Sequence, residues 1–123
     1  MLARRFPVVC VCPEQLGGLP TPREPSERRG DRVVTRSGAD VTGAFARGAE
    51  EACRLAALFG AKYALLKARS PSCGAHEIYD GSFNGRRVAG QGFTAQALRA
   101  MGVRVYDEAE IDRLVEDMER DGI

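Results

Sequence analysis

The run 66–74, with the sequence LKARSPSCG, constrains this chain more than any other stretch. Pro71 fixes its own φ and biases the preceding serine toward extended backbone, and the closing glycine permits a sharp bend. Because an apolar segment ends just before it, we expect a rigid turn at the end of a strand, presenting two hydroxyl groups and one thiol. Lys67 and Arg69 would favour a thiolate at Cys73. The alternative is a tight turn around a buried cysteine.

The composition indicates one soluble globular domain, residues 1–123. Of 123 residues 44% are hydrophobic and 28% charged, and 18 basic against 17 acidic residues leave a formal charge of +1. This balance favours neither a nucleic-acid partner nor a membrane surface. No apolar run approaches the roughly 20 residues that cross a bilayer, and nothing resembles a signal peptide. We expect a cytoplasmic protein with reduced cysteines.

Apolar runs and helical periodicity alternate along the chain. This order predicts an α/β fold, a three-layer sandwich with a small, mostly parallel sheet, helices on both faces and a β-hairpin insertion at Asn84-Gly85. Residues 31–35 form a further weak strand. The main elements are strands at 6–12, 62–67 and 103–106, and helices at 42–59, 94–101 and 108–120.

The helix at 42–59 has one apolar face. Thr42 is its expected N-cap and Gly60 its C-cap, as Thr94 is the N-cap of the next helix. Cys53 borders the apolar face and is expected in the core. The residues of the face are Phe45, Ala49, Ala52, Ala56 and Phe59.

Glycine and proline are dense in the loop 17–26 (GGLPTPREPS). Three prolines within six positions restrict its backbone, so the loop should be ordered. It has no Gly-Lys-Ser/Thr sequence and no helix directly after it, so it is not a phosphate-binding loop. It is either a structural surface loop or a loop that lines a substrate site.

Cys12 and Cys73 each follow the carboxyl end of a predicted strand, where parallel α/β sheets bind ligands. Cys10 would lie on the same face as Cys12, two residues deeper. Two or three thiols at one edge suit zinc or an iron–sulfur centre, although the spacing matches no common motif. Glu14 and Ser70 would flank the site, as a carboxylate for proton transfer and a hydroxyl for orientation.

A set of short motifs resembles the 2-thiouracil desulfurase (TudS-like) family. The resemblance spans residues 7 to 108, and its motifs are specific in combination. They are VCPE at 11–14, GGLPTPR at 17–23, DVT at 40–42, LLK at 65–67, SPSCG at 70–74, YDGSF at 79–83 and GQGFTA at 90–95.

The resemblance implies a 4Fe–4S cluster held by three cysteines, with one iron open to the substrate's sulfur. It implies non-redox desulfuration of a thiolated pyrimidine, a thiouracil-like nucleobase, to the oxo form plus sulfide. Cys12 and Cys73 would be cluster ligands, and Glu14 and Ser70 the acid–base and positioning residues. An open iron is a Lewis acid that polarises the C–S bond.

The chain departs from this family at its start. Family members begin with a strand ending in a Ser-Ala-Cys motif, whose cysteine is the third ligand, and here that strand and the helix after it are absent. The sequence is then a fragment, a misassigned start or a shortened paralogue. The third ligand is missing, or Cys10 substitutes for it from about 6–7 Å away along a strand. The uncovered sheet edge invites homodimerisation.

Two other readings stay open. One is a cluster-free module that binds a small ligand or a partner through the turn 70–74. The other is a structural zinc site formed by Cys10, Cys12 and Cys73. His76 is the only histidine, and we expect it to be a surface or loop residue.

Overall fold

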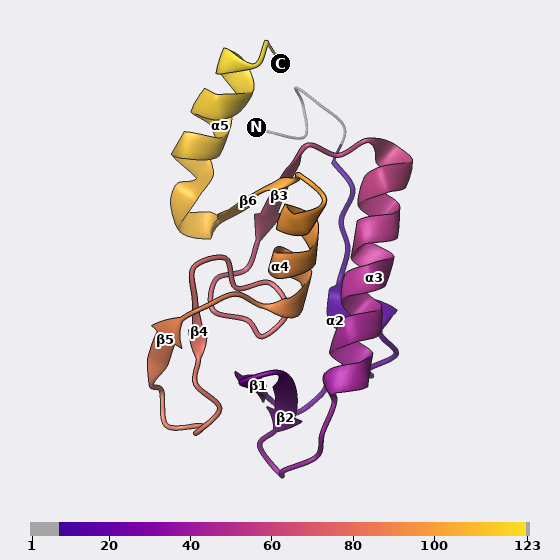
Figure 1. Ribbon diagram of the computed structural model, residues 1–123, viewed down its shortest axis with the longest axis vertical. Helices are drawn as coiled ribbons and strands as arrows, with labels where there is room; N and C mark the ends of the chain where they lie inside the picture. The colour runs from indigo at the N-terminus through magenta and orange to yellow at the C-terminus, as the bar shows by residue number, and fades with distance from the viewer. Residues whose placement is uncertain (1–7, 123) are drawn as a thin grey trace.

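Two parallel strands lie at the centre of the molecule between helices on both sides (Figure 1). The computed structural model describes residues 8–122. Strands β3 (Tyr63–Leu66) and β6 (Arg104–Asp107) pair in parallel, with Tyr63 opposite Arg104. Helices α3 (Thr42–Phe59) and α4 (Phe93–Ala100) lie on one side of this pair, and α5 (Ile111–Arg120) lies on the other.

Side chains alternate between the two faces of this pair, as the pleat of a strand requires. Val105 packs into one apolar cluster with Ala95 and Leu98 of α4, which Cys53 and Leu66 border. The next residue, Tyr106, packs into a second cluster with Leu114 and Met118 of α5. The helices therefore cover both faces, as the sequence predicts.

Two antiparallel hairpins complete the fold. The first joins β1 (Ser26–Arg29) to β2 (Arg32–Thr35), and the second joins β4 (Glu77–Tyr79) to β5 (Arg87–Ala89). The second is the predicted insertion, and its loop contains Asn84 and Gly85. The α/β class is confirmed. Instead of one larger sheet, the strands within residues 8–122 form three two-stranded sheets.

The segment predicted as a strand at 6–12 differs. Residues 6 and 7 lie outside the described residues, and residues 8–12 form no strand. Val8, Val9 and Val11 are exposed, since no strand within 8–122 pairs with them and an apolar run forms a strand only against a partner. Helix α2 (Pro13–Leu16) follows directly, with proline at its first position, where the missing N–H is harmless.

The predicted helix ends move by one or two residues. Val41 and Gly92 are the N-caps of α3 and α4, because the two threonine hydroxyls bond elsewhere: Thr42 Oγ1 accepts from the Val33 N–H, and Thr94 Oγ1 bonds Ser72. Gly60 ends α3 in the left-handed conformation as expected. The predicted final helix begins as a 3₁₀ turn, η1 (Glu108–Glu110), before α5.

The apolar face of α3 is shorter than predicted. It is buried through Ala52, but Phe59 is 61% exposed at the last turn. No helix within residues 8–122 is both long and apolar enough to span a bilayer.

Candidate functional site

The turn after β3 is rigid because one serine closes it twice. Ser70 Oγ accepts the backbone N–H of Ser72 at 3.0 Å and that of Cys73 at 3.1 Å. The Ser70 carbonyl oxygen also accepts the N–H of Gly74 at 2.8 Å. Serine hydroxyls commonly close turns in this way, and the turn predicted from the sequence is confirmed. The prediction that it presents two hydroxyls is wrong, because the Ser72 hydroxyl is buried against Thr94.

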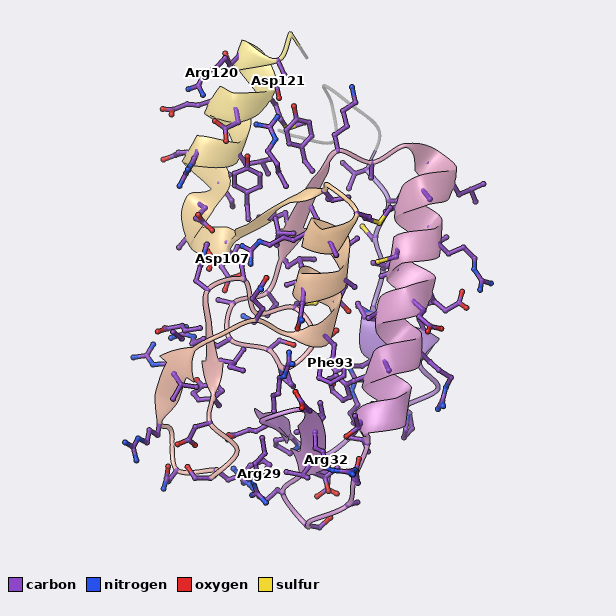
Figure 2. The ribbon with its side chains drawn as sticks, in the orientation of Figure 1. Arg29, Arg32, Phe93, Asp107, Arg120 and Asp121 are labelled. Carbon is purple, nitrogen blue, oxygen red and sulfur yellow. The ribbon has the colours of Figure 1, made fainter. Side chains whose placement is uncertain are left out.

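The first turn of α4, where Figure 2 labels Phe93, holds this turn in place. The Phe93 N–H donates to the Pro71 carbonyl at 2.9 Å, and the Thr94 N–H donates to the Ser72 carbonyl at 2.8 Å. The two buried hydroxyls of Ser72 and Thr94 lie 2.7 Å apart. A Cβ at Gly92 would lie 2.3 Å from the Ser72 carbonyl. Only glycine allows this close approach.

Cys12 is held from the other side, by α2 docking on α3. It is the N-cap residue of α2, and its carbonyl accepts the N–H of Leu16 at 3.0 Å. A Cβ at Gly17 would lie 1.9 Å from the Ala44 carbonyl oxygen, and one at Gly48 would lie 1.9 Å from the Pro13 carbonyl oxygen. Two glycines therefore let the backbone beside Cys12 lie directly on α3.

Arg23, from the proline-rich loop, joins the sulfur of Cys12 to the carboxylate of Glu14. Its Nη2 lies 3.6 Å from Cys12 Sγ, and its Nε donates to Glu14 Oε1 at 3.2 Å. Nη1 donates to Pro20 O at 3.1 Å and to Thr21 Oγ1 at 3.0 Å. The hydrogen bond to Glu14 is the main reason that the pKa of Arg23 is raised. The loop 17–26 therefore lines this site.

Cys73 lies within electrostatic range of both groups. Burial is the main reason that its pKa is raised, and negative charge on Glu14 and Cys12 raises it further. The Ser72 side chain and the Lys67 backbone oppose this with hydrogen bonds. Cys73, about sixty positions after Cys12 and Glu14 in the sequence, is therefore close enough for both groups to act on it electrostatically.

The expectation that basic side chains favour a thiolate at Cys73 is wrong. The Lys67 side chain is 81% exposed and its ammonium lies 3.9 Å from Glu108. Burial therefore sets the thiol's protonation, as in an apolar environment.

The other two cysteines differ in their surroundings. Cys10 is exposed, and no backbone hydrogen bond holds residues 8–11 within the described chain. Cys53 borders the core, and burial raises its pKa. Within residues 8–122, Cys10, Cys12 and Cys73 do not form a trio whose sulfurs all lie within 4.8 Å of one another. This spacing disfavours the single zinc ion. A four-iron cluster binds each cysteine at a different iron and needs a wider spacing.

His76 belongs to another part of the surface, as expected. Its Nε2 lies 2.6 Å from Glu110 Oε1. Glu110 and Asp107 form a capping box at η1, in which each carboxylate accepts a hydrogen bond from a backbone N–H group. Two open grooves of about 620 Å³ each run along α5, and neither is lined by Cys12 or Cys73.

The site combines two thiols, a carboxylate and an arginine in a small α/β protein. Thiolates are the ligands that soft metals and iron–sulfur clusters prefer. The 2-thiouracil desulfurase family model matches residues 1–110, and the chain belongs to this family.

Two relatives agree with this membership. One is the uncharacterized protein YbbK of Bacillus subtilis (strain 168), 40% identical over an alignment of 117 positions; the match covers 87% of this chain and 78% of that protein. The other is a solved structure of a [4Fe-4S]-dependent thiouracil desulfidase, TudS, 50% identical with a TM-score of 0.85. That match covers 88% of this chain and 72% of the solved chain.

Sequence reasoning did not single out Arg23. Its signal was an arginine after two prolines in a loop that its composition predicts to be ordered. The pattern indicates a fixed side chain but does not indicate which groups it contacts.

Proposed function

We propose that this protein is an iron–sulfur-dependent desulfurase that acts on a thiolated pyrimidine, a nucleobase of the 2-thiouracil type. The bridge that Arg23 makes between Cys12 and Glu14, together with the electrostatic effect of both groups on Cys73, supports the proposal. In the reaction, the C–S bond breaks, a C–O bond forms with water, and both water protons leave with the sulfur as hydrogen sulfide. The exchange needs no oxidant or reductant.

The donor set fits an iron–sulfur cluster. Thiolate sulfurs are the ligands that such clusters prefer, and Cys12 and Cys73 supply two of them beside an arginine that offsets negative charge. When bound, the cluster would supply a Lewis-acidic iron that polarises the C–S bond. We propose Cys10 as the third ligand, since it lies two residues from Cys12 and no backbone hydrogen bond restricts its segment within the described chain.

Glu14 is the proposed acid–base residue. Arg23 engages its Oε1, and its Oε2 makes no hydrogen bond within the described residues. This second oxygen is available to accept a proton from the attacking water and to return it to the departing sulfur.

Ser70 is the proposed positioning residue. Its Oγ already accepts two backbone N–H groups, so its own hydroxyl proton is directed away from the turn. Ser70 therefore acts as a hydrogen-bond donor to a substrate heteroatom. A hydroxyl anchored in this way loses little rotational freedom when it binds the base.

The proposal also includes a cytoplasmic location, because all four cysteines are free, and a single domain. Homodimerisation through a sheet edge is part of it, since β3 and β6 each pair with only one strand within residues 8–122. Light scattering of the purified protein tests this.

Anaerobic reconstitution with iron and sulfide tests the function. We expect a brown protein that releases sulfide from 2-thiouracil, and we expect Cys73→Ser to lose both colour and activity. Cys53→Ser is the matched control, because that thiol lies at the core and should leave iron content unchanged. A folded wild-type protein that binds no iron and releases no sulfide would instead support the cluster-free binding module.

A further inference from the structure

The guanidinium of Arg23 contacts the Cys12 sulfur and the Glu14 carboxylate at the same time, and backbone and side-chain oxygens of its own loop hold it there. Its planar guanidinium uses Nη2 on Cys12, Nε on Glu14 and Nη1 on the Pro20 carbonyl and Thr21 hydroxyl. The Arg23 side chain is 22% exposed and the Glu14 side chain 24% exposed. All three nitrogens are therefore engaged, and the side chain is restricted to one orientation.

We propose that Arg23 is a positioning residue that fixes the Cys12 sulfur and the Glu14 carboxylate in one arrangement, an inference that rests on the proposed function. Arginine stays protonated in proteins, so it takes no part in proton transfer itself. It acts by orienting the acid–base oxygen relative to the metal-binding sulfur.

Lysine cannot take this place. An ammonium group is a compact point charge without the rigid fork that reaches two partners at once. Arg23→Lys thus keeps the charge and loses the geometry, whereas Arg23→Met loses both. A donor to a ligand sulfur also raises the reduction potential of an iron–sulfur cluster, which provides a readout independent of turnover.

Arg47 is the matched control. It is an arginine of the same region, and its Nη2 donates to the Gly17 carbonyl at 3.2 Å, but it contacts neither Cys12 nor Glu14. Arg47→Met tests the effect of losing an arginine that only anchors the loop.

The experiment compares the wild type with Arg23→Lys, Arg23→Met and Arg47→Met after anaerobic reconstitution. The measurements are iron per protein, the reduction potential, and kcat and KM for 2-thiouracil. We expect both Arg23 variants to lose about 10- to 100-fold in kcat, as when groups supporting metal ligands are removed, with KM changing less than about threefold. Arg23→Met should also lower the reduction potential, and Arg47→Met should match the wild type.

A second measurement uses the apoprotein. The Nε–H resonance of Arg23 should exchange slowly with solvent in NMR spectra and should shift in Glu14→Gln. If both Arg23 variants fail to bind iron while Arg47→Met binds it, the placement of Cys12 depends on Arg23, which supports the inference.

Three results would overturn the inference: unchanged kcat and potential in both Arg23 variants, equal losses in Arg47→Met, or a rapidly exchanging Arg23 Nε–H. A wild-type protein that takes up no iron refutes the proposed function instead, and the apoprotein measurement still decides the role of Arg23.

Discussion

Gly48, in the middle of α3, lies so close to Pro13 that a Cβ at position 48 would be 1.9 Å from the Pro13 carbonyl oxygen. Glycine inside a helix costs about 1 kcal/mol relative to alanine. The position is therefore used for close packing rather than for helix formation. Because Cys12 directly precedes Pro13, this contact also helps to fix the backbone that carries the Cys12 sulfur.

Gly48→Ala should destabilise the protein, because the α2 backbone must move away from α3. We expect a loss of about 1–3 kcal/mol, typical of overpacking, measured by urea unfolding, together with weaker iron retention. Gly43→Ala on the same helix is the control, since its Cβ would meet only Arg47 Nη1 at 3.6 Å. It should be neutral or stabilising by up to about 1 kcal/mol. Equal effects of the two substitutions would contradict the close contact.

The hydroxyl pair of Ser72 and Thr94 predicts strong coupling between the Cys73 turn and α4. Each oxygen is the partner of the other in the interior. Ser72→Ala therefore removes the side-chain partner of the Thr94 hydroxyl, and Thr94→Val leaves the Ser72 hydroxyl only its interaction with Cys73. Each single change should cost about 1–3 kcal/mol. The double variant should cost less than the sum, and a double-mutant cycle of urea unfolding measures the difference. Strict additivity would show that the bond contributes no coupling.

The sequence predicted the parts of the fold that depend on local patterns. The run Tyr63–Leu66 is a strand and Gly60 ends a helix because apolar periodicity and glycine dihedrals act over a few residues. The segment 8–12 has the same apolar composition but pairs with no strand among the described residues. Strand pairing is a long-range property, so the pattern alone did not decide it.

The candidate site was predictable to the same extent. The positions of Cys12 and Cys73 after two predicted strands suggested a shared site, and the electrostatic effect of Cys12 on Cys73 agrees with it, although no strand precedes Cys12 within residues 8–122. Arg23 was missed because its contacts depend on how a proline-rich loop folds back onto Cys12 and Glu14. The protonation of Cys73 was misjudged because burial, which the sequence does not display, is the main influence on its pKa, while the Lys67 side chain is exposed beside Glu108.

The hydrogen bonds of the Asp40 carboxylate predict that the protein loses stability in acid. Its carboxylate accepts the Thr42 N–H at the start of α3 and also bonds Arg32. The pKa of the Asp40 carboxyl is lowered from 3.8 to about 2, and the main cause is its hydrogen bonding with Thr42. A carboxyl whose pKa is lowered by folding stabilises above its unfolded pKa and loses this effect as the pH falls through the folded value. The stabilisation should therefore be complete above about pH 4 and lost toward pH 2.

The test compares thermal unfolding of the wild type and Asp40→Asn from pH 7 to pH 2. The variant should be less stable at pH 7, and the difference should shrink between pH 4 and pH 2. Arg32→Gln removes the ion pair but keeps the Thr42 bond, so it should retain most of the pH dependence. A constant difference across the whole range would exclude the Asp40 carboxylate as the cause.

Cys10→Ser tests the third ligand of the proposed cluster. Because Cys10 is exposed, the substitution removes a sulfur without opening a cavity, and the urea midpoint of the apoprotein should stay unchanged. Hydroxyl groups are poor ligands for iron–sulfur centres compared with thiolates. We therefore expect the iron content after reconstitution to fall as far as in Cys73→Ser, while Cys53→Ser keeps the wild-type value. Full iron content in Cys10→Ser would show that a group other than Cys10 is the third ligand. The 4Fe–4S absorption and electron paramagnetic resonance spectra of that variant would then help to identify this group.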